Sequence, residues 1–399
     1  MLRYITSGES HGKCLTSIIE GIPANVELNI DEINSELKKR QCGYGRGGRM
    51  KIESDTIDIL SGVRGKKTLG GPIAIKINNR DYENWTKYMN PMEEIDRESK
   101  KVNNVRPGHA DLVGSLKYDF DDARNVLERS SARETASRVA IGAISKQVLK
   151  EFGIDFASHV VKIGNVKIEK DYEFDYIKEN VDVSEVRCVD KNIEKLMIEE
   201  IDNTKENKDT VGGIIEVRVK NVPLGLGSYV HFDRKIDAHL AMHLMGTQAI
   251  KGVEIGVGFD VGNSRGSEIM DEIYYEENKG IHRKSNKLGG IEGGMTTGDE
   301  IVIRCAMKPI PTLYKPLNSI NMNTLENYKA TVERSDTCAV PACSVVCENV
   351  VAFVILQFFL EKFGHDSIEQ IKENYNSYIW KENYNSYICR LGDRGWKRI

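Results

Sequence analysis

The chain has 399 residues, of which 40% are hydrophobic and 29% charged, and its formal net charge is −4 at pH 7. A chain of this length can bury a substantial core without disulfides or structural metals. The slight acidic excess argues against general nucleic-acid binding, which requires a basic surface.

The first predicted element is a helix over residues 29–40. Asn29 is suited to cap it, with Glu32 three residues later as in a capping box. The helix ends in basic residues, which suit the negative end of the helix dipole. Gly43 is suited to terminate it, and the apolar stripe consists of Ile30, Ile33 and Leu37.

Gly43, Gly45 and Gly48 then form a G-x-G-x-x-G, the spacing of dinucleotide-binding folds. In those folds the glycines follow a strand and open a helix. Here they follow a helix and lead into a β-rich run, 50–60. An NADP-dependent oxidoreductase is therefore the weaker interpretation, and it would need a strand before Gly43.

Further elements alternate irregularly along the chain. A helix over 131–152 begins with Ser131 and Glu134 in S-x-x-E spacing. A second, 341–363, is apolar nearly all round and is predicted to lie in a core or a subunit interface. Its apolar run is too short for a membrane span, which takes about 20 residues. The pattern favours the α+β class, with further strands at 72–78, 213–222, 254–259 and 301–307.

Five loops concentrate glycine, arginine, histidine and small polar residues, a composition that lets a ligand approach the backbone. They are GESHGK (8–13), RQCGYGRGGR (40–49), VRPGHAD (105–111), RSSARE (129–134) and ERSDTCAVPA (333–342). Two of them precede predicted helix starts, whose free N–H groups attract anions. Their arginines add planar donors for phosphate or carboxylate. Together the loops predict a polyanionic ligand.

His11 and His109 lie beside glycines in two of these loops. Either is suited to exchange a proton near neutral pH, although each alone fits a loop histidine with one hydrogen bond equally well. His239 and His243 have metal-ligand spacing, but residue 240 is not the glutamate of a zinc-protease motif. We predict no metal site there or at Cys338, Cys343 and Cys347.

The five loops, in this order, resemble the chorismate synthase family. AIKGVEIGVGF and GGIEGGMTTGDEIVIRCAMKPIPTL extend the resemblance over most of residues 1–360. It fades in 166–210, which we interpret as peripheral, and after about residue 365. It implies one catalytic domain over 1–365. The tail, 366–399, carries the direct repeat KENYNSYI, which is not a feature of the family. The implied fold is a β-α-β sandwich with a central helical layer between antiparallel sheets, assembled as a homotetramer.

The resemblance implies a carbon–oxygen lyase, acting in the last step of the shikimate pathway. It would remove phosphate from 5-enolpyruvylshikimate 3-phosphate by a 1,4-anti elimination that gives chorismate. The reaction requires reduced FMN without net redox change, and NADPH is a possible reductant. In the implied roles, His11 protonates the leaving phosphate and His109 stabilises the reduced flavin. Asp336 passes a proton at the flavin N5, tuned by Ser10 and Ser130.

The substrate is a tri-anion and needs several arginines. The candidates are Arg40, Arg46, Arg49, Arg106, Arg133 and Arg334. The resemblance assigns FMN to Arg129, Ser130, Ser131, Gln248, Ala249, Gly293, Lys308, Pro309, Ile310, Pro311, Thr312 and Arg334. Arg40 and Arg46 also match positions described as binding NADP, although a substrate-phosphate role fits them at least as well.

The remaining expectations concern location and an alternative function. The N-terminal residues lack a signal-peptide pattern, and the eight cysteines contain no C-x-x-C pair. We therefore expect a cytoplasmic protein without membrane or nucleic-acid partners. A non-catalytic protein that binds a phosphorylated ligand is the second alternative, and it would release no phosphate.

Overall fold

The computed structural model describes residues 1–47, 54–276, 280–333 and 335–383, with the side chains of 380–383 left out of the description. Two antiparallel sheets dominate it. The smaller sheet has the strand order β1 (Arg3–Ser7), β2 (Cys14–Glu20), β6 (Ile73–Asn78), β3 (Ile57–Ile59). The larger has the order β10 (Ile250–Ile255), β15 (Ile301–Met307), β9 (Gly213–Lys220), β7 (Asp155–Ile163), β8 (Val166–Lys167).

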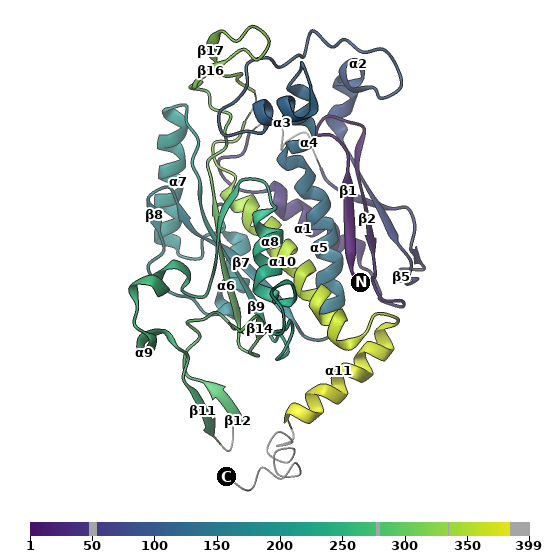
Figure 1. Ribbon diagram of the computed structural model, residues 1–399, viewed down its shortest axis with the longest axis vertical. Helices are drawn as coiled ribbons and strands as arrows, with labels where there is room; N and C mark the ends of the chain where they lie inside the picture. Colours follow the sequence, from purple (N-terminus) through teal and green to yellow (C-terminus); the bar gives the residue numbers. More distant parts are fainter. Residues whose placement is uncertain (48–53, 277–279, 334, 384–399) are drawn as a thin grey trace.

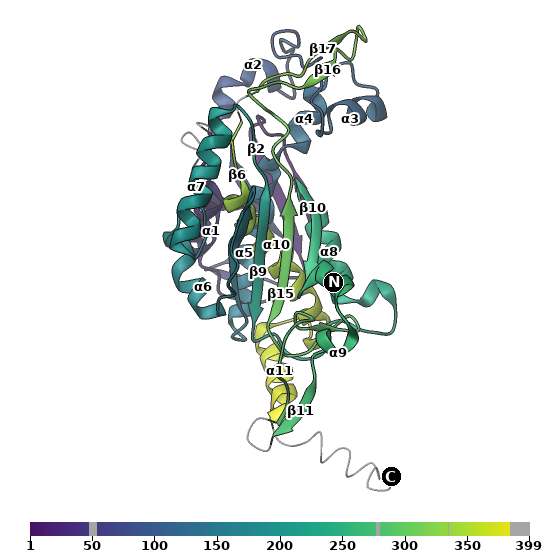
Figure 2. The same cartoon turned by 90° about the vertical axis from the view of Figure 1, so that its left-hand side faces the viewer.

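Helices lie between the two sheets (Figures 1 and 2). α5 (Thr135–Lys150) packs against β2, and α10 (Val340–Phe363) packs against β7 and β9. The two helices cross closely because Gly142 has no side chain. A Cβ there would lie 2.2 Å from the carbonyl oxygen of Asn349. α1 (Ile30–Gln41) and α8 (Ile236–Met245) flank this pair. The predicted α+β class, with antiparallel sheets, is confirmed.

Smaller elements gather at the two ends of the molecule in Figure 1. The upper end holds α2 (Thr86–Met89), α3 (Asp111–Tyr118), α4 (Arg124–Ser130) and the hairpin β16–β17 (Asn318–Ile320, Asn327–Lys329). The lower end holds α9 (Gly266–Ile269), α11 (Ile368–Asn383) and the hairpin β11–β12 (Ile273–Glu276, Gly280–Arg283). The hairpin β13–β14 (Ile291–Glu292, Met295–Thr296) contacts α8 through β14. The short pair β4–β5 (Val63–Arg64, Lys67–Thr68) precedes β6.

The predicted helix over 29–40 is confirmed as α1. The side chain of Asn29 accepts hydrogen bonds from the backbone N–H groups of Asp31 and Glu32. The reciprocal half of the capping box does not form, because the N–H of Asn29 donates to Gln147 on α5 at 3.0 Å. A tertiary contact between the two helices therefore replaces the local one.

The helix predicted to begin at Ser131 begins at Thr135. Ser130 is the last residue of α4, and Ser131 instead caps a short 3-10 turn, Ala132–Glu134, by accepting from the N–H of Arg133. Among the predicted strands, 72–78, 213–222 and 301–307 match β6, β9 and β15 closely. The strand predicted over 254–259 is wrong beyond Ile255, where β10 ends, because a 3-10 helix begins at Gly258. The part of 50–60 that is described contains β3.

The helix predicted over 341–363 is α10, with Pro341 in its first turn and Gly364 after its end. It is long and apolar enough to cross a membrane by composition alone, but 94% of its most apolar window is buried inside the protein. The predicted core position is therefore confirmed. Its side chains join both sheets into one hydrophobic core.

The segment 166–210 and the tail both contact this core. α6 (Phe174–Asn180) and α7 (Lys191–Glu206) lie along the β7–β8 edge of the larger sheet, as Figure 2 shows. Val186 and Cys188, however, belong to the main core. The first copy of the repeat lies on α11. There Tyr375 packs against the rings of Phe359 and Phe363 on α10.

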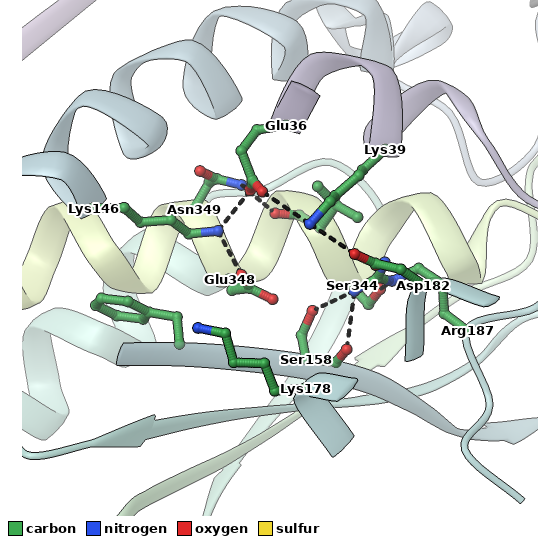
Figure 3. A network of polar contacts seen from close by, with 12 residues as sticks. Glu36, Lys39, Lys146, Ser158, Lys178, Asp182, Arg187, Ser344, Glu348 and Asn349 are labelled. Atoms are coloured by element: carbon green, nitrogen blue, oxygen red, sulfur yellow. Dashed lines mark hydrogen bonds and ion pairs between the residues drawn. The ribbon is translucent and has the colours of Figure 1, made fainter. Parts of the chain in front are cut away.

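A network of charges joins α1, α5 and α10 on one side of the helical layer (Figure 3). Lys146 on α5 pairs with Glu36 at 2.6 Å and also with Glu348. The side-chain amide of Asn349 donates to Glu36 at 2.9 Å. Lys39 pairs with Asp182 at 2.8 Å. The network lines a cavity of about 620 Å³, and every carboxylate named here has a basic partner.

We expect Glu36 to make the protein acid-sensitive. Burial alone would raise the pKa of Glu36, but the charges of Lys146 and Lys39, with the hydrogen bonds from Lys146 and Asn349, lower it to about 2. Because the folded-state pKa lies below the unfolded value, this stabilisation is present above about pH 4.5 and is lost as the pH falls toward 2. Glu36→Gln should lower the free energy of unfolding at pH 7 by on the order of 2 kcal/mol, measured by urea denaturation.

The difference between Glu36→Gln and the unmodified protein should shrink between pH 5 and pH 3.5. Glu32→Gln is the matched control, because Glu32 pairs with an exposed Lys150 at 3.0 Å and such pairs contribute at most about 1 kcal/mol. A difference that stays constant across this pH range would contradict the assignment.

Candidate active site

His11 lies in the 8–13 loop that joins β1 to β2. This loop closes tightly, because a Cβ on Gly8 would lie 2.5 Å from the carbonyl oxygen of Cys14. Both carboxylate oxygens of Glu128 hold His11: Oε2 accepts from its backbone N–H at 2.7 Å, and Oε1 lies 2.8 Å from its ring Nδ1. The indole of Trp85 stacks on the ring, with centroids 3.9 Å apart.

Glu128 is buried at the C-terminal half of α4. Burial alone would raise its pKa, but the hydrogen bonds and charge of His11, with the charge of Arg124, lower the pKa below its ordinary value. Arg124 lies 3.4 Å from Glu128 and donates to Glu333 at 2.9 Å. The carboxylate is therefore ionised at neutral pH and can only accept hydrogen bonds.

His109 repeats this arrangement in the 105–111 loop. Its Nδ1 lies 2.6 Å from Oδ1 of Asp111, a carboxylate that is fully buried at the start of α3. Asp111 also receives a bidentate pair from Arg106, at 2.7 and 3.0 Å. Burial would raise the pKa of Asp111, but the contacts with His109 and Arg106 lower it well below its usual range. Arg106 reaches Thr312 at 2.9 Å.

Arg40 and Arg133 share one buried carboxylate. The nearer guanidinium nitrogen of Arg133 lies 2.7 Å from Oδ2 of Asp55, and that of Arg40 lies 3.5 Å away. Burial lowers the pKa of Arg40 to about 9, against the opposing effect of the Asp55 charge. Arg133 also donates to Asn79 at 2.9 Å, and Asn79 donates to the carbonyl of Gly12 at 2.7 Å. This contact links the second and fourth loops to the first.

The glycine-rich loop meets the 333–342 loop directly. Asp336 accepts from the backbone N–H of Gly47 at 2.6 Å and pairs with Arg46 at 3.3 Å. The N–H of Thr337 donates to the carbonyl of Gly45 at 2.9 Å. A cavity of about 890 Å³ opens beside this junction and extends to α7. Arg49 and Arg334 lie outside the described residues.

The residues assigned to FMN begin at a contact across one end of the larger sheet, where β15 ends and β10 begins. The N–H of Lys308, just after β15, donates to the carbonyl of Ala249 at 2.9 Å. The ammonium of Lys308 donates to the carbonyl of Gly108 at 2.8 Å, and the half-buried Lys308 has a pKa lowered by burial and by the nearby charges of Lys251 and Arg106. In the same run, the carbonyl of Ile310 accepts from the hydroxyl of Thr210, and Pro309 and Pro311 flank it.

Gln248 continues this connection toward the smaller sheet. Its amide donates at 3.0 Å to Glu134, which also accepts from Thr6 at 2.8 Å. Arg129 donates to the hydroxyl and the carbonyl of Thr6, both at 2.8 Å. Through these contacts the loop 105–111 joins the other four, so that all five loops form one connected cluster.

The three serines lie at the centre of the cluster. Ser10 is buried, and its backbone N–H donates to the carbonyl of Glu128 at 2.9 Å. The hydroxyl of Ser131 lies 3.1 Å from that of Ser10. Ser130 Oγ and Gln248 Oε1 are buried without a hydrogen-bond partner among the described residues.

Gly293 is not brought to this cluster within one chain. It lies between β13 and β14, beside Tyr229. The adjoining Thr296 contacts Gly225, which accepts from Lys362 near the C-terminal end of α10. The cluster lies at the N-terminal end of this 24-residue helix, which at 1.5 Å per residue is about 36 Å long. The assignment of Gly293 to FMN stays a prediction.

The histidine pair on α8 has other partners. His239 lies 2.7 Å through Nε2 from the carbonyl oxygen of Asp233. His243 packs against the ring of Phe353, and burial, with the nearby charges of His239 and Arg138, lowers its pKa to about 4. The two side chains thus belong to the packing between α8 and α10.

The residues that the sequence analysis missed are mostly acidic. Asp111 and Glu128 orient the two histidines, Asp55 pairs two arginines, and Glu134 joins three elements. Asp111 ends the VRPGHAD loop and Glu128 precedes RSSARE, so adjacency to the motifs was an available signal. Trp85 and Asp55 lie outside the five loops and had no comparable signal.

Comparisons with known proteins agree on one family. The family model described as chorismate synthase matches residues 2–360. The chorismate synthase of Alkaliphilus metalliredigens is 59% identical over 379 residues, which cover 95% of this chain and 99% of that protein. That of Caldicellulosiruptor saccharolyticus is 55% identical over 382 residues, covering 95% and 100%.

A solved structure agrees with the sequence relatives. A crystal structure of chorismate synthase superimposes with a TM-score of 0.76 at 42% identity, covering 94% of this chain and 97% of that one. The chain therefore belongs to the chorismate synthase family, the carbon–oxygen lyases that convert 5-enolpyruvylshikimate 3-phosphate to chorismate.

Proposed function

We propose that the connected cluster of five loops is the site at which this chain carries out the reduced-FMN-dependent elimination. The observation that carries the proposal is the pair of loop histidines, each held through Nδ1 by a buried carboxylate and each lying within the arginine-rich cluster. Such an arrangement orients a ring for proton transfer. A cluster built only to bind a phosphorylated ligand would not need it.

The residues present fit FMN. Ser130 Oγ and Gln248 Oε1 are buried polar atoms without a partner among the described residues, and a flavin offers both N–H donors and carbonyl acceptors. Lys308 supplies a positive charge for the phosphate of the cofactor. We assign FMN to Arg129, Ser130, Ser131, Gln248, Ala249, Lys308, Pro309, Ile310, Pro311 and Thr312. When bound, reduced FMN supplies the transient electron that weakens the substrate C–O bond.

The chain's own residues bind the substrate and move protons. His11 donates the proton on Nε2 to the departing phosphate. His109 stabilises the reduced cofactor, and Asp336 would pass a proton at the flavin N5, with Ser10 and Ser130 tuning Asp336. Arg40 and Arg133 share the single carboxylate of Asp55, so one positive charge is left unbalanced. This charge makes the electrostatic potential of the site more positive, which attracts the tri-anionic substrate.

Arg46, Arg106 and, outside the described residues, Arg49 and Arg334 complete the proposed substrate clamp. Arg46 lines the 890 Å³ cavity, whereas the side chain of Arg40 is only 8% exposed. We therefore favour a substrate role for Arg40 and Arg46 over NADP binding. NADPH as reductant, a homotetramer of sandwich-type subunits and a cytoplasmic location remain part of the proposal, supported by the likeness to the family.

An anaerobic assay tests this function. The protein is mixed with 5-enolpyruvylshikimate 3-phosphate and chemically reduced FMN, and chorismate and phosphate are followed together. We expect equal amounts of both products and none with oxidised FMN alone. Substrate binding without phosphate release would instead favour the non-catalytic alternative. Turnover with NADPH and oxidised FMN would show that the chain reduces its own flavin.

Lys308→Met should weaken FMN binding about tenfold or more, because a charge-assisted contact with phosphate contributes roughly 1.5–3 kcal/mol. Quenching of flavin fluorescence measures the Kd. Lys167→Met is the control, since Lys167 is an exposed lysine on β8, at the opposite edge of the same sheet. Equal losses in the two variants would remove Lys308 from the cofactor site.

A further inference from the structure

We infer that Glu128 is a positioning residue for His11, fixing which ring nitrogen exchanges the proton. The inference rests on the proposed function, in which His11 donates to the leaving phosphate. Nδ1 of the ring lies 2.8 Å from Glu128 Oε1. Since an ionised carboxylate is only an acceptor, Nδ1 must carry a hydrogen, and the proton exchanged with substrate is the one on Nε2.

The orientation of the ring is determined from three sides. Glu128 Oε2 holds the backbone of His11 at 2.7 Å, while Oε1 holds its ring. Trp85 stacks on the ring face, and the guanidinium of Arg124 lies 5.2 Å from the same indole. The ring therefore keeps its Nδ1 on Glu128 when the Nε2 proton leaves.

The carboxylate is buried and fixed in its ionised form. The side chain of Glu128 is 2% exposed, and its backbone carbonyl accepts from the N–H of Ser10. Arg124 balances its charge and connects it to Glu333. Since α4 supplies Glu128 and Arg124 together, the helix holds His11 in a defined position in its glycine-flanked loop.

A glutamine cannot reproduce this pair of contacts. Glu128 accepts two hydrogen bonds, one from the backbone and one from the ring, whereas Gln offers one oxygen and one donating amide. If its oxygen accepts from the backbone, its amide faces Nδ1 and selects the ring with hydrogen on Nε2 alone. If the oxygen turns to the ring, two N–H groups face one another. Either choice disturbs proton transfer through Nε2.

Asp111 provides an internal comparison. It orients His109 in the same way, but it also binds Arg106 with both oxygens. A change at Asp111 therefore acts through two side chains, whereas a change at Glu128 should act on the reaction mainly through His11. The same double-mutant experiment should therefore give different results for Glu128 and Asp111.

The experiment is a double-mutant cycle on kcat in the reduced-FMN assay. Glu128→Gln should lower kcat about 10- to 100-fold, by analogy with the loss of a carboxylate that orients a metal-binding histidine, with a smaller change in KM. In the His11→Ala background the same substitution should change kcat by less than about twofold. Asp111→Asn should still lower kcat severalfold in the His109→Ala background, because Arg106 loses its partner.

The pH profile provides a second readout that a structural role would not move. His11→Ala should abolish one limb of the plot of kcat against pH. Glu128→Gln should shift that same limb to a different pH. Glu128→Asp keeps the charge and both acceptors, so it should recover part of the lost rate. Glu216→Gln, in a buried pair between His159 on β7 and Glu216 on β9, should lower thermal stability without changing kcat.

Equal losses from Glu128→Gln in the two backgrounds would overturn the positioning role. If Glu128→Gln does not fold, Glu128→Asp is judged in both backgrounds by the same criterion. An unchanged rate in His11→Ala itself would instead remove His11 from the proposed function, so the two failures are distinguishable.

Discussion

His11→Ala is expected to lower kcat by about 10²–10⁴-fold, the range found when general acid–base help is lost, while FMN binding and the fold remain intact. The expulsion of a phosphate needs a proton at the leaving oxygen, and His11 is the histidine that the fold fixes between Glu128 and Trp85. Glu128 keeps its pair with Arg124 when the ring is removed, and Trp85 keeps its hydrogen bond to Asp81. Rapid-mixing measurement of phosphate release with reduced FMN gives the rate.

The control for this prediction is His239→Ala. His239 is also partly exposed and also bound to a single acceptor, the carbonyl of Asp233, but it lies on α8 among the packing residues. Its removal should leave kcat unchanged within about twofold. A His11→Ala enzyme that releases phosphate at the unmodified rate would show that water or another group supplies the proton. His109→Ala should slow turnover at least tenfold by the same reasoning.

Elements with strong local signals could be predicted from the sequence. α10 has Pro341 at its start, Gly364 at its end and apolar residues on every face, so both its bounds and its burial follow. Asn29 likewise marks the start of α1. Ser131 misled the prediction because the S-x-x-E pattern is local. In the structure, α4 ends directly before Ser131. The position of α4 depends on the packing of Glu128 and Arg124, which a local pattern does not show.

The strands β1, β2 and β7 were not predicted. β1 and β2 flank the 8–13 loop, and their outer faces carry Ile5 and Ile18, which are exposed, so the alternation between apolar and polar residues is weak. In β7 the inward and outward faces are both buried. His159 on its outer face is covered by a charged network around Glu216, which no periodicity of apolar residues reveals.

The basic residues assigned to the site stand out in the sequence, whereas most of the acidic residues around them do not. Arginine and histidine beside glycine are uncommon and stand out in loops such as VRPGHAD. Aspartate and glutamate are frequent on any surface, and only the fold shows that Asp55, Asp111 and Glu128 are buried against those bases. Gly293 shows the opposite case. The motif around it can be recognised by its resemblance to the family, but within one chain Gly293 lies far from the other residues assigned to FMN.

Asp55→Ala is expected to destabilise the protein by about 3–5 kcal/mol at pH 7, because removing one partner leaves a buried charge uncompensated. Here the loss affects two guanidinium groups, Arg40 and Arg133, whose side chains are 8% and 6% exposed. Urea denaturation gives the change in free energy of unfolding. Glu20→Ala is the control, since its pair with Arg3 is largely exposed and should contribute less than about 1 kcal/mol.

The same variant shows whether the paired arginines can receive an anion. Asp55 Oδ1 is buried without a hydrogen-bond partner among the described residues, so the carboxylate is held by charge rather than by a complete set of contacts. If its position is accessible to a ligand's phosphate, inorganic phosphate should stabilise Asp55→Ala by RT ln(1 + [L]/Kd), and more strongly than it stabilises the unmodified protein. Equal stabilisation of both would mean that Arg40 and Arg133 act on the substrate only through their field. A destabilisation below 1 kcal/mol would mean that the two arginines already have sufficient compensation from Thr135, Ala132 and Asn79.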